Sequence, residues 1–185
     1  MQFLDKPDEE PGQRVTEPAG ICMENLASYL NDHLAGSVAA LELLNRLIKA
    51  YPDDTRASFF LILHHEIDQD QRTLRDLMKK LGAEESTTQK AGAWITEKLL
   101  RGKIQPGESS NGQLGLLLAL ETLVLGITGK QALWRALVSA SQDIPPLAGV
   151  DYAALERRAM DQRDRVECER IHVARSALGQ GWSTG

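Results

Sequence analysis

The sequence predicts an all-α protein in which four long helices form a bundle. Three observations favour this fold. Apolar residues recur three and four positions apart through four long stretches of the chain. Each stretch has roughly 26 to 29 residues and would span about 40 Å, so the helices match in length. A short, a long and an intermediate link separate them, and link lengths determine which helices are antiparallel neighbours.

The first helix is predicted over residues 25–50, where one face collects large apolar side chains: Leu30, Leu34, Val38, Leu41, Leu44 and Ile48. Pro52 ends this helix, because proline cannot continue it, and Asp54 can cap the next one. The second helix is predicted over 54–81. It stops at Gly82, since glycine tolerates the left-handed conformation beyond a helix end.

A third long helix is predicted over residues 113–141, with Leu116, Leu120, Leu123, Ile127, Trp134 and Val138 aligned. Gly126 and Gly129 lie within it, and we expect them to let a neighbouring helix approach closely. Pro145 and Pro146 break the chain. Asp151 can cap a last long helix that reaches about residue 178.

The link between the second and third long helices is long enough to cross the bundle. Ser86 and Gln89 fit a capping box, which predicts a short extra helix over 87–101. A long crossover joins parallel helices, whereas the shorter links join antiparallel ones. The sequence therefore predicts an up-down-down-up bundle with a short helix in its crossover.

The chain of 185 residues suits one domain, and its 42% hydrophobic and 25% charged residues are ordinary globular usage. Residues 1–20 are rich in proline and charge, which predicts a disordered arm before a bundle over 21–179 and a tail over 180–185. The net charge of -5 indicates no basic surface that would bind the phosphate groups of a nucleic acid. We therefore expect no nucleic-acid partner.

The expected location is cytoplasmic, without a membrane partner. Two cysteines, Cys22 and Cys168, form neither a disulfide framework nor a metal-ligand spacing. The N-terminal residues lack the layout of a signal peptide. The longest apolar run, 114–127, is shorter than a bilayer span and contains Glu121.

Polar residues interrupt the apolar faces of the second and last helices. At 100° per residue, His64 and Gln71 fall within the apolar stripe of the second helix and Asp68 on its edge. One hypothesis is a buried ionic network in the bundle, because charged groups inside a protein must be paired or hydrated. Its candidate members are His64, Asp68, Gln71, Glu156, Arg163, Glu167 and Arg170, with Glu42, Asn45, Asp70 and Lys130 as further partners. The alternative is that these long side chains lie along the surface with their heads in water.

The order of links resembles the ferritin-like superfamily over roughly residues 25–178. The resemblance implies a di-iron or di-manganese site built from two Glu residues and two Glu-x-x-His pairs that point inward. The literal match, Glu169 with His172, lies off the apolar face, and nearer that face Glu167 is followed by Arg170. Because a guanidinium cannot ligate a metal, we expect no intact site. If iron or manganese binds, the candidate ligands are Glu42, His64, Asp68, Glu121 and Glu167.

Three functional interpretations remain open. The favoured one is a bundle of unassigned activity that acts as a binding or interaction module, with an unknown small-molecule ligand or a homodimer through a helix face. The second is a noncanonical metal-dependent oxidoreductase or iron-handling protein. The third is an enzyme that uses acid and base pairs of the polar core on a small organic substrate, which fold alone cannot support.

Overall fold

The computed structural model describes residues 19–52, 55–86 and 110–179, and these residues form helices and connecting turns without a strand. The long helices are α1 (Ala19–Ala50), α2 (Thr55–Lys80), α4 (Ser110–Ala140) and α5 (Tyr152–Gly179). A short 3₁₀ helix, η1 (Pro145–Leu147), lies between α4 and α5. The all-α prediction is therefore confirmed. The predicted arm, crossover helix 87–101 and tail lie outside the described residues, apart from 19 and 20, which are already helical.

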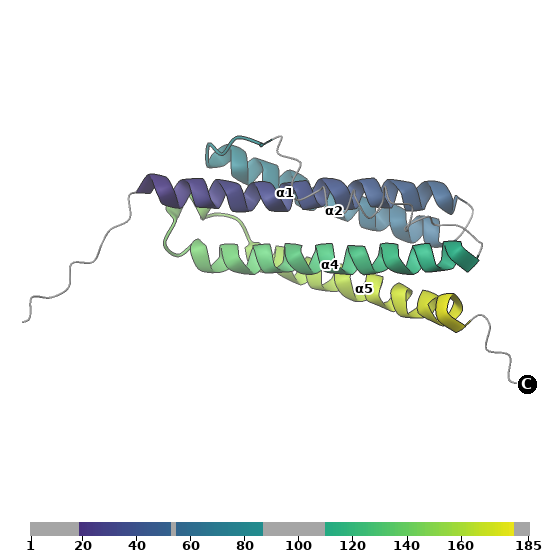
Figure 1. Cartoon of the computed structure of the whole chain (residues 1–185). Helices are drawn as coiled ribbons and strands as arrows, with labels where there is room; N and C mark the ends of the chain where they lie inside the picture. The colour runs from purple at the N-terminus through teal and green to yellow at the C-terminus, as the bar shows by residue number, and fades with distance from the viewer. Residues whose placement is uncertain (1–18, 53–54, 87–109, 180–185) are drawn as a thin grey trace, which may run out of the picture.

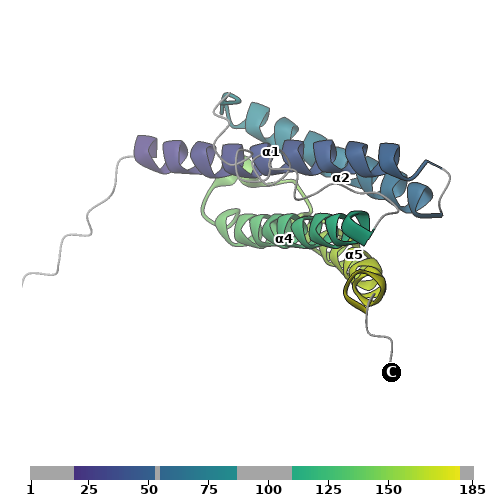
Figure 2. The same cartoon turned by 45° about the vertical axis from the view of Figure 1, so that its right-hand side comes forward.

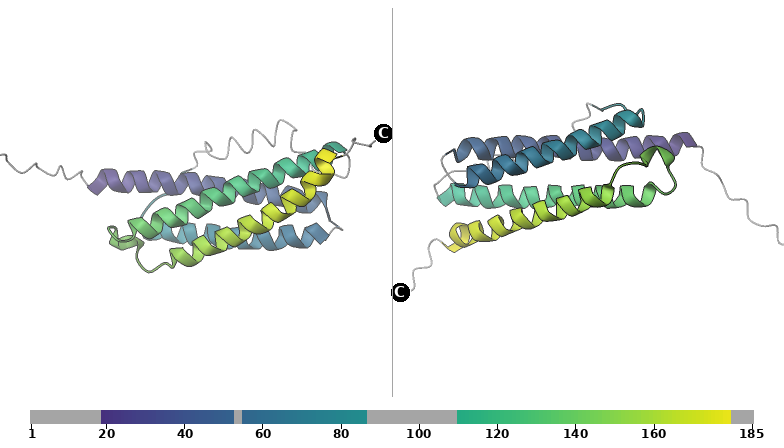
Figure 3. Two further views of the ribbon diagram at one scale, coloured as in Figure 1. Left: turned by 90° about the horizontal axis from the view of Figure 1, so that it is seen from below. Right: turned by 180° about the vertical axis from the view of Figure 1, so that it is seen from behind.

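The four long helices are arranged as two packed pairs. Helix α1 packs on α2, and α4 packs more extensively on α5. Figures 1 and 2 show the two pairs as two layers, with α1 and α2 in one and α4 and α5 in the other. Figure 3 shows the same layering from behind. Contact between the layers is made most strongly by α1 and α4.

The helix ends follow the predicted local signals. Gly82 has a φ of 67°, and the N–H of Ala83 donates to Met78 O at 2.9 Å, which closes the end of α2. At the start of α5, Asp151 Oδ1 accepts a hydrogen bond from the Ala154 N–H at 2.9 Å. Both predicted caps are confirmed. Helix α1 starts earlier than predicted, at Ala19.

A single hydrophobic core joins the two layers. Its fully buried large side chains include Leu30, Leu43, Leu44, Leu47, Phe60, Leu63, Met78, Leu116, Leu120, Leu123, Leu133 and Trp134. Val38 and Val138, which the periodicity placed on buried faces, are exposed. In α1 the apolar residues surround much of the helix, so several faces fit the pattern, and packing buries Leu43 and Leu47 instead.

Candidate functional site

Four polar side chains meet in the interior, and we call them the Asp70 cluster: Asp70, Lys130, Arg158 and Gln162. Asp70 is only 2% exposed, and Gln162 is fully buried. Lys130 Nζ donates to Asp70 Oδ2 at 2.5 Å and also to Gln162 Oε1. Arg158 Nη2 donates to Asp70 Oδ1. The cluster therefore ties together α2, α4 and α5 by hydrogen bonds and ion pairs.

Helical spacing explains how these side chains reach the interior. Asp70 lies three residues after Ile67 and four before Leu74, both buried in the core. Gln162 lies at the same spacing between Ala159 and Val166, which are fully buried. Sequence reasoning singled out Asp70 and Lys130 only as further partners, and it missed Gln162. The position of Gln162 within a buried stripe was the signal that would have found it.

The charges within the Asp70 cluster do not balance, because one carboxylate faces two cations. Burial lowers the pKa of Lys130, and the neighbouring Asp70 charge acts in the opposite direction. The side chains of Lys130 and Arg158 are 13% and 35% exposed, so both cations are partly withdrawn from water. The cluster is thus a largely buried site with positive charge in excess.

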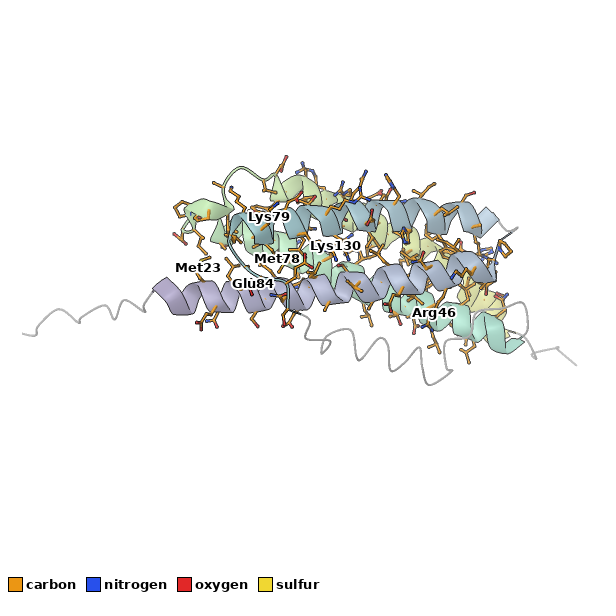
Figure 4. The ribbon with its side chains drawn as sticks, turned by 90° about the horizontal axis from the view of Figure 1, so that it is seen from above. Met23, Arg46, Met78, Lys79, Glu84 and Lys130 are labelled. Carbon is orange, nitrogen blue, oxygen red and sulfur yellow. The ribbon has the colours of Figure 1, made fainter. Side chains whose placement is uncertain are left out.

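A cavity of about 200 Å³ lies beside this cluster, between α1, α2 and α4. Its apolar wall is formed by Ala40, Ile67, Leu74, Ile127, Leu133 and Trp134. Its polar groups are Asp32, His33, Ser37, Asp70, Gln71 and Lys130. Figure 4 looks onto α1 and α2 and shows Lys130 between them. The cavity thus combines a large apolar surface with one charged wall.

Glycines help to create this space. Gly36, Gly126 and Gly129 line the cavity. A Cβ atom placed on any of them would have no other atom within 4 Å, apart from its chain neighbours and the nearby backbone of its own helix. The prediction that Gly126 and Gly129 let a neighbouring helix approach closely is therefore wrong. The missing side chains open the cavity instead of bringing backbones together.

A second polar group borders the same cavity. Gln71 is 4% exposed; its Nε2 donates to Ser37 Oγ at 2.8 Å, and its Oε1 accepts from Arg75 Nη1. Ser37 Oγ in turn donates to Leu34 O at 2.7 Å. Gln71 therefore retains its second amide N–H and one lone pair of its carbonyl oxygen for further partners.

His33 also lines the cavity, and its ring stands edge-on to Tyr29 with centroids 4.7 Å apart. Burial lowers the pKa of His33, although the charge of Asp32 opposes that shift. The lowered pKa favours the neutral form of His33, whose ring adds an aromatic surface, one N–H donor and one acceptor nitrogen to the site.

The predicted polar core is distributed over several places. Of its candidate members only Gln71 is buried, together with the further partner Asp70. His64 is half-buried on α2. Glu156 pairs with Arg135, whose side chain is 67% exposed. Arg163 bonds Asp164 at 2.8 Å and Gln131 at 3.2 Å. Within the described residues, the Asp70 cluster has no hydrogen bond to Gln71, His64, Glu156 or Arg163.

The candidate metal ligands are also separated or already paired. Glu42 is exposed, and Asp68 pairs with Arg72 one turn along α2. Arg170 binds both oxygens of Glu167 at 2.7 Å and reaches Glu121 at 3.4 Å. A guanidinium therefore stands between two of the carboxylates. In the part of the chain that the structure describes, no three His, Cys, Asp or Glu side chains are grouped to hold an ion.

Helix α4 is strongly apolar along most of its length. Residues Gly112–Ala140 are long and apolar enough to cross a membrane by length and composition, and 50% of the most apolar window is buried in the bundle. Core helices of bundles have the same composition. The exposed apolar side chains of the described residues, including Leu61 and Ile62 on α2 and Leu125 on α4, are spread over several helices.

Comparison with known proteins assigns no function to this site. No protein-family model, no curated protein and no solved structure matches the chain.

Proposed function

We propose that this protein is a ferritin-like bundle that acts as a binding module, and that it holds a small, largely apolar molecule in the cavity between α1, α2 and α4. The cavity itself carries the proposal. A cavity of about 150 Å³ accommodates a benzene-sized molecule, and this one measures about 200 Å³. Ligand sites in proteins are typically apolar pockets with a few placed polar groups, and they occur between the helices of bundles.

The course of the helices supports the ferritin-like part of the proposal. In Figure 1, α1 and α5 run from left to right, whereas α2 and α4 run in the opposite direction. This is the order expected when the link between α2 and α4 crosses the bundle. The Asp70 cluster then lies in the interior between helix pairs, where the superfamily places its functional groups.

Binding can be tested with a neutral probe, 2-phenylacetamide, added to ¹⁵N-labelled full-length protein. Gly36, Gly126 and Gly129 line the cavity, so the signals of their backbone amides should shift with saturable dependence on probe concentration. Gly129→Leu should abolish these shifts by filling the cavity. Gly179→Leu is the matched control, because Gly179 also has open space around it and does not line the cavity. Shifts scattered over the surface, or unchanged in Gly129→Leu, would refute the proposal.

The metal-dependent alternative makes a different prediction. If Arg170 holds Glu121 and Glu167 as ion pairs, these carboxylates are not available to a metal. Protein expressed with added iron and manganese should then retain well below one metal ion per chain after desalting. Elemental analysis that finds about two ions per chain, as the superfamily's dinuclear site requires, would favour the oxidoreductase or iron-handling alternative.

A further inference from the structure

The charged wall of the cavity keeps hydrogen-bond donors available to a ligand. Three donors, from Lys130, Arg158 and Gln162, already bond the two oxygens of Asp70. Lys130 has three N–H groups and donates two of them, to Asp70 and Gln162. Its third N–H is the strongest group left for a ligand, and the second amide N–H of Gln71 is another.

Buried donors without partners lie in the same part of the interior. Within the described residues, two buried side-chain polar atoms have no hydrogen-bond partner, Trp134 Nε1 and Arg158 Nε. Both are N–H donors. Trp134 lines the cavity, and Arg158 belongs to the Asp70 cluster. The interior around the cluster thus holds N–H groups without acceptors, although neither atom exposes surface to the cavity.

The charge balance favours an anion over a neutral acceptor. Asp70 is shared between Lys130 and Arg158. Glu66, whose charge also acts on Lys130, is paired with Arg165. Positive charge therefore remains in excess in the cluster. Asp32 also lines the cavity, but its side chain is exposed, where water and salt screen its charge. A buried cation gains most from a partner that is both charged and hydrogen-bonded.

We propose that the ligand of this cavity is a small apolar monocarboxylic acid, whose carboxylate bonds Lys130 and whose hydrocarbon part packs against Ile67, Leu133 and Trp134. This inference rests on the proposed binding function and specifies its ligand. Gln71 is placed to donate to the second carboxylate oxygen. The apolar part of the lining offers no partner to a second negatively charged group on the ligand.

The test compares probes of nearly equal shape by isothermal titration calorimetry on the full chain. Phenylacetate carries the negative charge, 2-phenylacetamide replaces it with a neutral amide, and 2-phenylethylamine carries a positive charge. Because hydrogen bonds to charged groups are stronger than neutral ones, phenylacetate should bind about fivefold or more tightly than the amide. The amine should bind more weakly than either.

Lys130→Gln should remove this preference and leave the acid and the amide with equal affinity. Lys79→Gln is the matched control, because Lys79 is exposed on α2 and does not line the cavity; it should keep the preference. If Lys130→Gln fails to fold, the comparison of the three probes on the unchanged protein still decides the matter.

Two results would overturn the inference in distinguishable ways. Equal binding of the acid and the amide, or tighter binding of the amine, would refute the acid ligand and leave the proposed binding function standing. Absence of binding by all three probes would refute both.

Discussion

Substitution of Asp70 by Asn tests whether the buried cluster is held together by charge. The side chain keeps its size and loses the carboxylate that bonds both Lys130 and Arg158. Asp70 is 2% exposed, so little water is available to replace that charge. Breaking a buried ion pair by removing one partner costs about 3 to 5 kcal/mol.

The expected loss lies near the lower end of that range. Arg158 is 35% exposed and can turn part of its guanidinium to water, whereas Lys130 at 13% has less access. We therefore expect the free energy of unfolding to fall by about 3 kcal/mol. For a chain of this size that corresponds to a melting temperature lower by about 6 to 12 °C.

Urea unfolding followed by circular dichroism measures this loss, and the same helix supplies the control. Asp68 lies two residues away and pairs with Arg72, whose side chain is 68% exposed. Asp68→Asn should therefore cost only about 0.5 kcal/mol. Adding Lys130→Met to Asp70→Asn should recover part of the loss, because it removes one stranded cation. If Asp70→Asn costs no more than Asp68→Asn, the cluster is hydrated and the electrostatic argument fails.

Three smaller perturbations test other parts of the structure. Gly129→Ala should raise the free energy of unfolding by about 0.5 to 1 kcal/mol, because alanine favours the helix and its Cβ meets open space; a loss in chemical denaturation would mean that the site is crowded. Tyr152→Phe should cost about 1 kcal/mol, since it removes the buried hydrogen bond from the hydroxyl to Leu147 O at 2.8 Å, and an unchanged urea midpoint would show that this bond contributes nothing. Burial lowers the pKa of His33 below 6.5, so the unfolded chain binds more protons and stability falls as the pH drops through that value. His33→Gln should therefore lose less stability than the unchanged protein between about pH 7.5 and about pH 5.5, and parallel pH profiles would contradict this assignment.

Much of the secondary structure could be predicted because its signals are local. The end of α2 depends on Gly82, and the start of α5 on Asp151, each acting through hydrogen bonds to residues within one or two turns. Pro52 likewise interrupts the chain directly after α1. Helix α1 begins at Ala19, and the prediction placed its start too late.

The candidate site was predicted only in part. The sequence placed polar side chains on the apolar face of the second helix, and Gln71 is indeed buried there. It did not indicate that Asp70, one residue earlier, is the centre of the ionic cluster. Adjacent helical residues point about 100° apart, so a small error in the assumed inward direction exchanges one for the other.

By itself, the sequence determined the all-α class and most helix ends, because periodicity, proline, glycine and capping residues act over a few positions. Only the tertiary structure decided which polar groups meet, because Asp70, Lys130 and Gln162 come from three helices whose mutual rotation is set by packing. It also decided that Gly126 and Gly129 border a cavity instead of a close helix contact. A missing side chain permits either outcome, and the separation of neighbouring helices selects between them.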